Sequence, residues 1–103
     1  MTMALTHWAF IYAADGCDPE RDVSITETGT CRTVLVGVGR PEQSPAVAAR
    51  LVADGVQLIE LCGAFGPVWT ARVIEKIGGA VPVGAVGYGP EATHGLHAIF
   101  TSR

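Results

Sequence analysis

The amino-acid sequence predicts an α/β fold, a compact layered domain with a mainly parallel sheet of four or five strands. Short apolar runs rich in β-branched residues alternate with two segments of helical periodicity. Each helical segment stands between two such runs, so the chain contains two βαβ units, which fold onto a parallel sheet through right-handed crossovers. The 103 residues form a single domain, 1–103, because two domains would leave neither half enough core.

Apolar runs define the expected strands of this sheet. Residues 7–14 are aromatic and β-branched, and residues 31–38 are apolar over most of their length, as expected when both faces of a sheet are covered. Residues 56–62 and 80–88 follow the two helical segments and provide the third and fourth strands. After a break rich in glycine and proline, residues 96–100 are predicted to form a short last strand.

Boundary residues define the two helices. Ser44 suits the capping position, Pro45 the first helical position, and Gly55 the left-handed conformation that ends a helix. The second helix begins at Pro67 and ends at the glycine pair 78–79. The stripes expected to face the sheet are Val47, Ala48, Leu51 and Val52 in the first helix and Thr70, Val73, Ile74 and Ile77 in the second.

Composition limits the possible functions. Hydrophobic residues make up 49% of the chain and charged residues 17%, with a net charge of −3. The seven basic residues are scattered, so no nucleic-acid partner is expected, and no apolar run approaches the ~20 residues of a membrane span. The apolar surplus indicates a homodimer or higher homo-oligomer. Three cysteines without CxxC spacing, and a start unlike a signal peptide, predict a cytoplasmic location.

The most conspicuous chemical groups, Glu60 and Cys62, lie where the third strand meets the second helix. In parallel sheets, ligands bind beyond the carboxyl ends of strands, near helix N-termini. The helix dipole there would favour a Cys62 thiolate and could hold a substrate oxyanion, whereas the alternative for Cys62 is a small buried hydrophobic residue. The residues expected to bind the ligand are Gly63, Ala64, Phe65 and Gly66, with Tyr12 and Tyr88 as candidate pocket walls.

Glu60 stands between apolar neighbours in the third strand, and ionised carboxylates are rarely buried without a partner. The functional interpretation is a general base that moves a proton next to a carbonyl group. The alternatives are a structural ion pair with an arginine such as Arg32 or Arg40, or a position near a subunit interface.

The remaining polar motifs predict little further chemistry. His94 is the expected acid/base partner of Glu60, and although His94 and His97 form an HxxH pattern, no metal ion is predicted, because nothing fixes the geometry. No cofactor is expected either, since Glu42 occupies the third glycine position of the dinucleotide fingerprint. Residues 15–30 lack a steady period and are predicted to be a long loop that closes over the site.

Four strings carry a resemblance to a known family: WAFIYAA at residues 8–14, TVLVGVG at 33–39, ELCGAFGP at 60–67 and VPVGAVGYGPE at 81–91. With them the chain resembles a bacterial family of small α/β proteins known only as a domain of unknown function. The resemblance spans most of the chain. It implies no activity and no catalytic residues.

Two classes of function follow from these observations. The leading hypothesis is a small-molecule enzyme of isomerase or lyase type, acting on a carbonyl-containing metabolite. Glu60 would be its acid/base, Cys62 a second acid/base or nucleophile, and the amides after Cys62 an oxyanion site. The alternative is a non-catalytic module that binds a small ligand or mediates oligomeric assembly, in which Glu60 is a structural charge.

Overall fold

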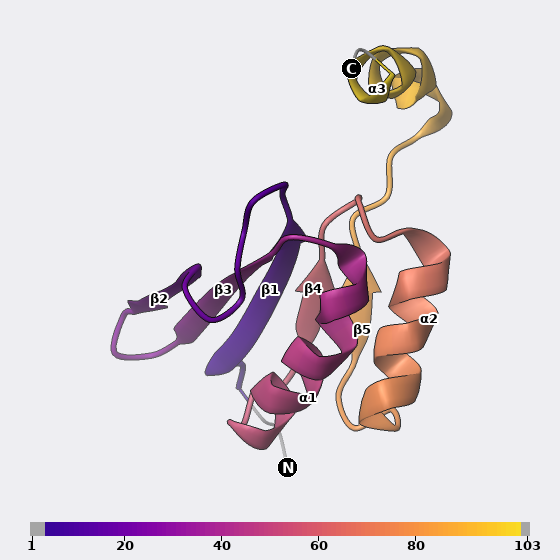
Figure 1. Cartoon of the computed structure of the whole chain (residues 1–103). Helices are drawn as coiled ribbons and strands as arrows, with labels where there is room; N and C mark the ends of the chain where they lie inside the picture. Colours follow the sequence, from indigo (N-terminus) through magenta and orange to yellow (C-terminus); the bar gives the residue numbers. More distant parts are fainter. Residues whose placement is uncertain (1–3, 102–103) are drawn as a thin grey trace.

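The computed structural model describes residues 4–101, which contain a five-stranded mixed sheet of order β2-β3-β1-β4-β5 (Figure 1). Within it β2 and β3 are antiparallel, and the other neighbouring pairs are parallel. The strands are β1 (His7–Ala13), β2 (Val23–Glu27), β3 (Arg32–Val38), β4 (Ile59–Leu61) and β5 (Val83–Ala85). The helices are α1 (Ser44–Ala53), α2 (Gly66–Ile77) and α3 (Thr93–Phe100), with short 3₁₀ turns η1 (Pro41–Gln43) and η2 (Pro90–Ala92).

Helices α1 and α2 lie on the same face of the sheet (Figure 1). Helix α1 connects β3 to β4 across β1, and α2 connects β4 to β5, so both right-handed crossovers run in one direction. The connection from β1 to β3 runs the other way, and a helix there would cover the opposite face. That connection contains the edge strand β2 instead, so the opposite face carries no helix within the described chain.

The core lies between the sheet and these two helices. Alternate residues of each strand point toward the helices, because side chains of a strand alternate between its two faces. Ile11, Ile59 and Leu61 are fully buried there, and burial of each contributes roughly 1.5–3 kcal/mol. The other buried apolar residues are Ala9, Val34, Val36, Val38, Val47, Ala48, Leu51, Val56, Phe65 and Val73.

The α/β fold is confirmed, but its sheet differs from the prediction. Strand β1 lies between β3 and β4, so the first predicted βαβ unit does not join neighbouring strands. The expected strands at 56–62 and 80–88 shorten to the three-residue β4 and β5. Pro82 has no amide to donate, and beyond Ala85 the chain leaves the edge of the sheet toward α3.

The sheet also contains the edge strand β2, which lies within the segment 15–30 that was expected to be a loop. Val23 and Ile25 alternate with polar residues there, a period that suits a half-covered edge strand. The predicted strand at residues 96–100 is wrong, because these residues belong to helix α3. Their apolar side chains, Leu96, Ile99 and Phe100, recur at helical spacing.

Both expected helices are present, and their ends are partly as predicted. Gly55 and Gly78 have φ angles of +100° and +61°, which confirms the left-handed ends. Ser44 is not the cap, because its buried hydroxyl donates to the Pro41 carbonyl at 2.7 Å, inside the turn that precedes α1. On α2 the core stripe is Trp69, Val73 and Ile77.

Ile74, expected to face the sheet, is 42% exposed, whereas Ile59 is fully buried. We therefore expect Ile59→Ala to lower the free energy of unfolding by about 2–5 kcal/mol, because it leaves a cavity in the core. Ile74→Ala should change it by less than about 0.5 kcal/mol. Denaturant unfolding of the two variants measures both values, and equal losses would contradict the burial of Ile59 in the core and the exposure of Ile74 on α2.

Candidate functional site

Glu60 lies on the sheet face opposite α1 and α2, where its neighbours across the strands are Phe10 of β1 and Gly84 of β5. Its side chain is exposed, so the expected burial of this carboxylate is wrong. Glu60 borders a small cavity of about 220 Å³ with Gly84, Ala85 and Val86. The alternative of an ion pair between Glu60 and an arginine is absent from the described residues, and Arg32 instead pairs with Glu27 at 3.0 Å.

Cys62 has the surroundings of a structural cysteine. Its side chain is half-buried and packs against the hydrophobic core. The Ala13 amide donates a hydrogen bond to the Cys62 sulfur at 3.4 Å, and the Cys62 amide donates to the Ile11 carbonyl. These contacts tie the end of β4 to β1, as expected of a small hydrophobic residue with a weak acceptor.

The turn after Cys62 has geometric reasons for its glycines. A Cβ on Gly63 would lie 2.7 Å from a ring carbon of Tyr88, so only glycine lets this ring pack on the turn. Gly66 has a φ of +65°, which glycine adopts without strain. Phe65 is buried in the core, and Ala64 is exposed. The turn is therefore explained without a bound oxyanion.

His94, the expected partner of Glu60, lies on α3, which is set apart from the sheet beyond its carboxyl end (Figure 1). Glu60 lies in β4 and Cys62 directly follows this strand, but the fold of a single chain does not bring His94 to them. Within residues 4–101, no group of three or more histidine, cysteine or acidic side chains is positioned to hold a metal ion.

Tyr12 lies near the carboxyl end of β1, opposite Gly37 of the neighbouring strand β3. A Cβ on Gly37 would lie 2.8 Å from the Tyr12 hydroxyl and 2.9 Å from the Cys17 sulfur, so the glycine leaves room for both groups. Partial desolvation raises the pKa of the Tyr12 phenol above 10.0, and Cys17 and Asp22 add to the increase.

Asp22 holds the loop between β1 and β2 in place. Its carboxylate accepts hydrogen bonds from the Asp18 amide at 2.8 Å and from the Arg21 guanidinium at 2.8 and 3.1 Å. Arg21 also donates to the Gly16 carbonyl at 2.8 Å. The hydrogen bonds from Arg21, and then that from the Asp18 amide, lower the pKa of Asp22 from 3.8 to about 2. The expected long closing loop is thus a short, internally bonded turn followed by β2.

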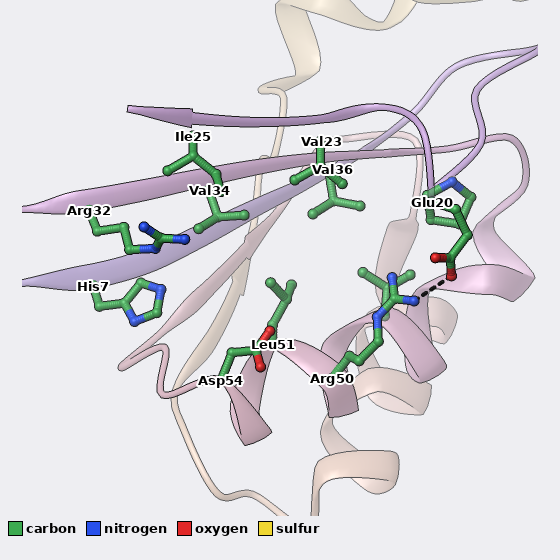
Figure 2. A pocket seen from close by; sticks show the side chains of 12 residues that line it. His7, Glu20, Val23, Ile25, Arg32, Val34, Val36, Arg50, Leu51 and Asp54 are labelled. Atoms are coloured by element: carbon green, nitrogen blue, oxygen red, sulfur yellow. Dashed lines mark hydrogen bonds and ion pairs between the residues drawn. The ribbon is translucent and has the colours of Figure 1, made fainter. Parts of the chain in front are cut away.

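A groove of about 790 Å³ lies on the helix side of the sheet, between β2–β3 and α1 (Figure 2). Its floor and walls include six apolar side chains: Val23, Ile25, Val34, Val36, Val47 and Leu51. The groove exists because the sheet is wider than the layer that covers it. Helix α1 crosses over β1, so the outer strands β2 and β3 extend beyond it.

Charged groups stand around this groove. His7 and Arg32 lie at one end, and the ion pair of Arg50 with Glu20 lies at the other (Figure 2). Asp54 stands on the α1 side, and among the described residues its carboxylate has no hydrogen bond or ion pair. A volume of this size, with an apolar floor and a few polar groups, is typical of small-molecule sites.

A family of unknown function, DUF6506, matches residues 6–101. The chain belongs to DUF6506. No curated protein and no solved structure matches it. None of the helices in the described part of this DUF6506 chain has the length and hydropathy needed to cross a membrane.

The sequence contained partial signals for the groove of this DUF6506 protein. The alternation at Val23 and Ile25 could have indicated a strand with one apolar face, and Arg32 marks the start of β3. Nothing in the spacing, however, indicates that His7, Arg32 and Arg50 approach one hollow. They come from three elements that meet only after β2 pairs with β3 and α1 crosses the sheet.

The Asp22 network makes a prediction about pH. Because the folded-state pKa of Asp22 is below its unfolded value, its stabilisation is complete above about pH 3.8 and is lost as the pH falls toward about 2. Arg21→Met should raise this pKa toward 3.8. Carboxyl-carbon NMR titration measures the shift, and Arg40→Met is the matched control that should leave Asp22 unchanged. A pKa near 3.8 in the native chain would contradict the network.

Proposed function

We propose that the chain is a non-catalytic binding protein for a small ligand that has an apolar body and a carboxylate. The observation that carries this proposal is the groove of about 790 Å³, with its apolar floor and the Arg32–His7 end. An apolar ligand body would displace water mainly from the exposed side chains of Val23 and Ile25, and the carboxylate would accept hydrogen bonds from Arg32.

The charges favour one end of the groove for the carboxylate. Arg50 already pairs with Glu20, whereas Arg32 pairs with the exposed Glu27 through one nitrogen and keeps further donors in its planar guanidinium. His7 stands beside Arg32 and can add a donor (Figure 2). Asp54 would accept a hydrogen bond from a hydroxyl or amine of the same ligand.

The isomerase- or lyase-type hypothesis at Glu60 and Cys62 stays a prediction with weaker support. In its favour, Glu60 is accessible at a cavity of about 220 Å³. Against it, the Cys62 side chain is half-buried against the hydrophobic core, and the single chain does not bring His94 to either residue. The binding proposal needs no reacting group. For a protein with three free cysteines we also propose a reducing, cytoplasmic location.

Arg32→Met tests the proposed ligand site, because it keeps much of the apolar stem and removes the charge. We expect it to weaken the binding of small carboxylates by about 10- to 100-fold, as for the loss of a hydrogen bond to a charged group. Isothermal titration calorimetry with a panel of aliphatic and aromatic carboxylates, each beside its neutral amide, measures the loss. NMR shifts should locate the ligand between β2–β3 and α1.

The matched control is Arg40→Met, because Arg40 is exposed and does not line the groove. This variant should bind as the native chain does. The proposal fails if no carboxylate of the panel binds in preference to its amide. It also fails if Arg32→Met binds as well as the native chain, or if the shifts lie outside the groove.

A further inference from the structure

The sheet face opposite α1 and α2 carries no helix among the described residues; we name it the open face. Its apolar residues are Trp8, Phe10 and Tyr12 of β1 and Leu35 of β3. They alternate with core residues, so they point away from the helices. Leu35 is 37% exposed, and the three aromatic side chains, each half-buried, form a stripe along the central strand, with Cys17 beside Tyr12 at its carboxyl end. Sheets with parallel strands like these normally have both faces covered.

Helix α3 is the second apolar surface without a cover. Figure 1 shows it beyond the carboxyl end of the sheet, on an extended segment at residues 86–89. Its main contacts are with the adjoining turn η2. Ile99 and Phe100 are 67% and 72% exposed, and with Leu96 they form one stripe at helical spacing. A helix of eight residues is marginal in water without a packing partner, so α3 needs a surface for its stripe.

We propose that the chain forms a symmetric homodimer in which α3 of each protomer packs on the open face of its partner. The dimensions agree, because eight helical residues span about 12 Å and the stripe from Trp8 to Tyr12 spans about 13 Å. The extended segment carries α3 away from its own sheet, which leaves it available to a second copy (Figure 1). The exchange places a helix on the open face of each mixed sheet, and twofold symmetry forms the contact twice.

The polar residues of the two surfaces also match. Glu60 lies on the open face beside Phe10, and a covered carboxylate needs a hydrogen-bond donor. Helix α3 has two histidines and no acidic residue. His97 adjoins the apolar stripe on the helix surface, so docking of α3 can bring its ring toward Glu60 of the partner.

Sedimentation velocity of the full chain from about 1 to 100 µM tests the dimer. The native chain should dimerise, and both Leu35→Glu and the double variant Ile99→Glu/Phe100→Glu should weaken dimerisation at least about 100-fold. Circular dichroism should remain native for α1, α2 and the sheet. The matched control is Ile74→Glu on the outer surface of α2, which should dimerise as the native chain does.

Mixing the two dissociated variants separates the exchange from other dimers. The Leu35→Glu protomer keeps its α3, and the double variant keeps its open face, so together they should form a heterodimer with one intact contact.

Direct stacking of two open faces predicts that the α3 substitutions have no effect on dimerisation, and this result would overturn the proposal. A monomeric native chain, a control that also dissociates, or dissociation by Ile25→Glu in the groove but not by Leu35→Glu would overturn it as well. Carboxylate binding in the groove is measured separately, so either proposal can fail alone.

Discussion

Right-handed crossovers carry both α1 and α2 to one face of the sheet, and this constraint decides what every strand residue faces. The chain moves from β3 over β1 to β4 and then to β5, always in one direction. Only the connection from β1 to β3 runs the other way, and it forms the edge strand β2 in place of a helix. One face is therefore a packed core, and the other is left to solvent or to a partner.

The same constraint explains why Glu60 and Cys62 differ from expectation. Glu60 points to the face without helices, so this carboxylate is accessible to water although its neighbours in the sequence are apolar. Cys62, at the end of the strand, is instead enclosed by the backbone of β1 and receives the Ala13 amide. The exposure of Glu60 therefore depends on the absence of a helix from that face of the sheet, and not on the neighbouring residues in the sequence.

The groove has a related origin. Two helices cover the middle of the sheet and β5, while the hairpin of β2 and β3 extends past α1. The uncovered part of the helix side becomes a hollow with an apolar floor, and Arg32, Arg50 and Asp54 reach it from different elements. A groove built in this way needs no sequence motif, because pairing of an edge strand is enough to create it.

The sequence by itself determined the α/β class, the strands β1 and β3, the two covering helices and the glycines that end them, because these depend on local periodicity and backbone preference. It did not determine which face of each strand is covered. The alternation of side chains along a strand places every second residue on the same face, but it does not say which face the helices cover. It also missed β2 and α3, whose short segments have weak local signals. Only tertiary structure decided that Glu60 is exposed, that His94 is distant and that His7 and Arg32 share a groove with α1, because crossover direction and strand order are long-range properties.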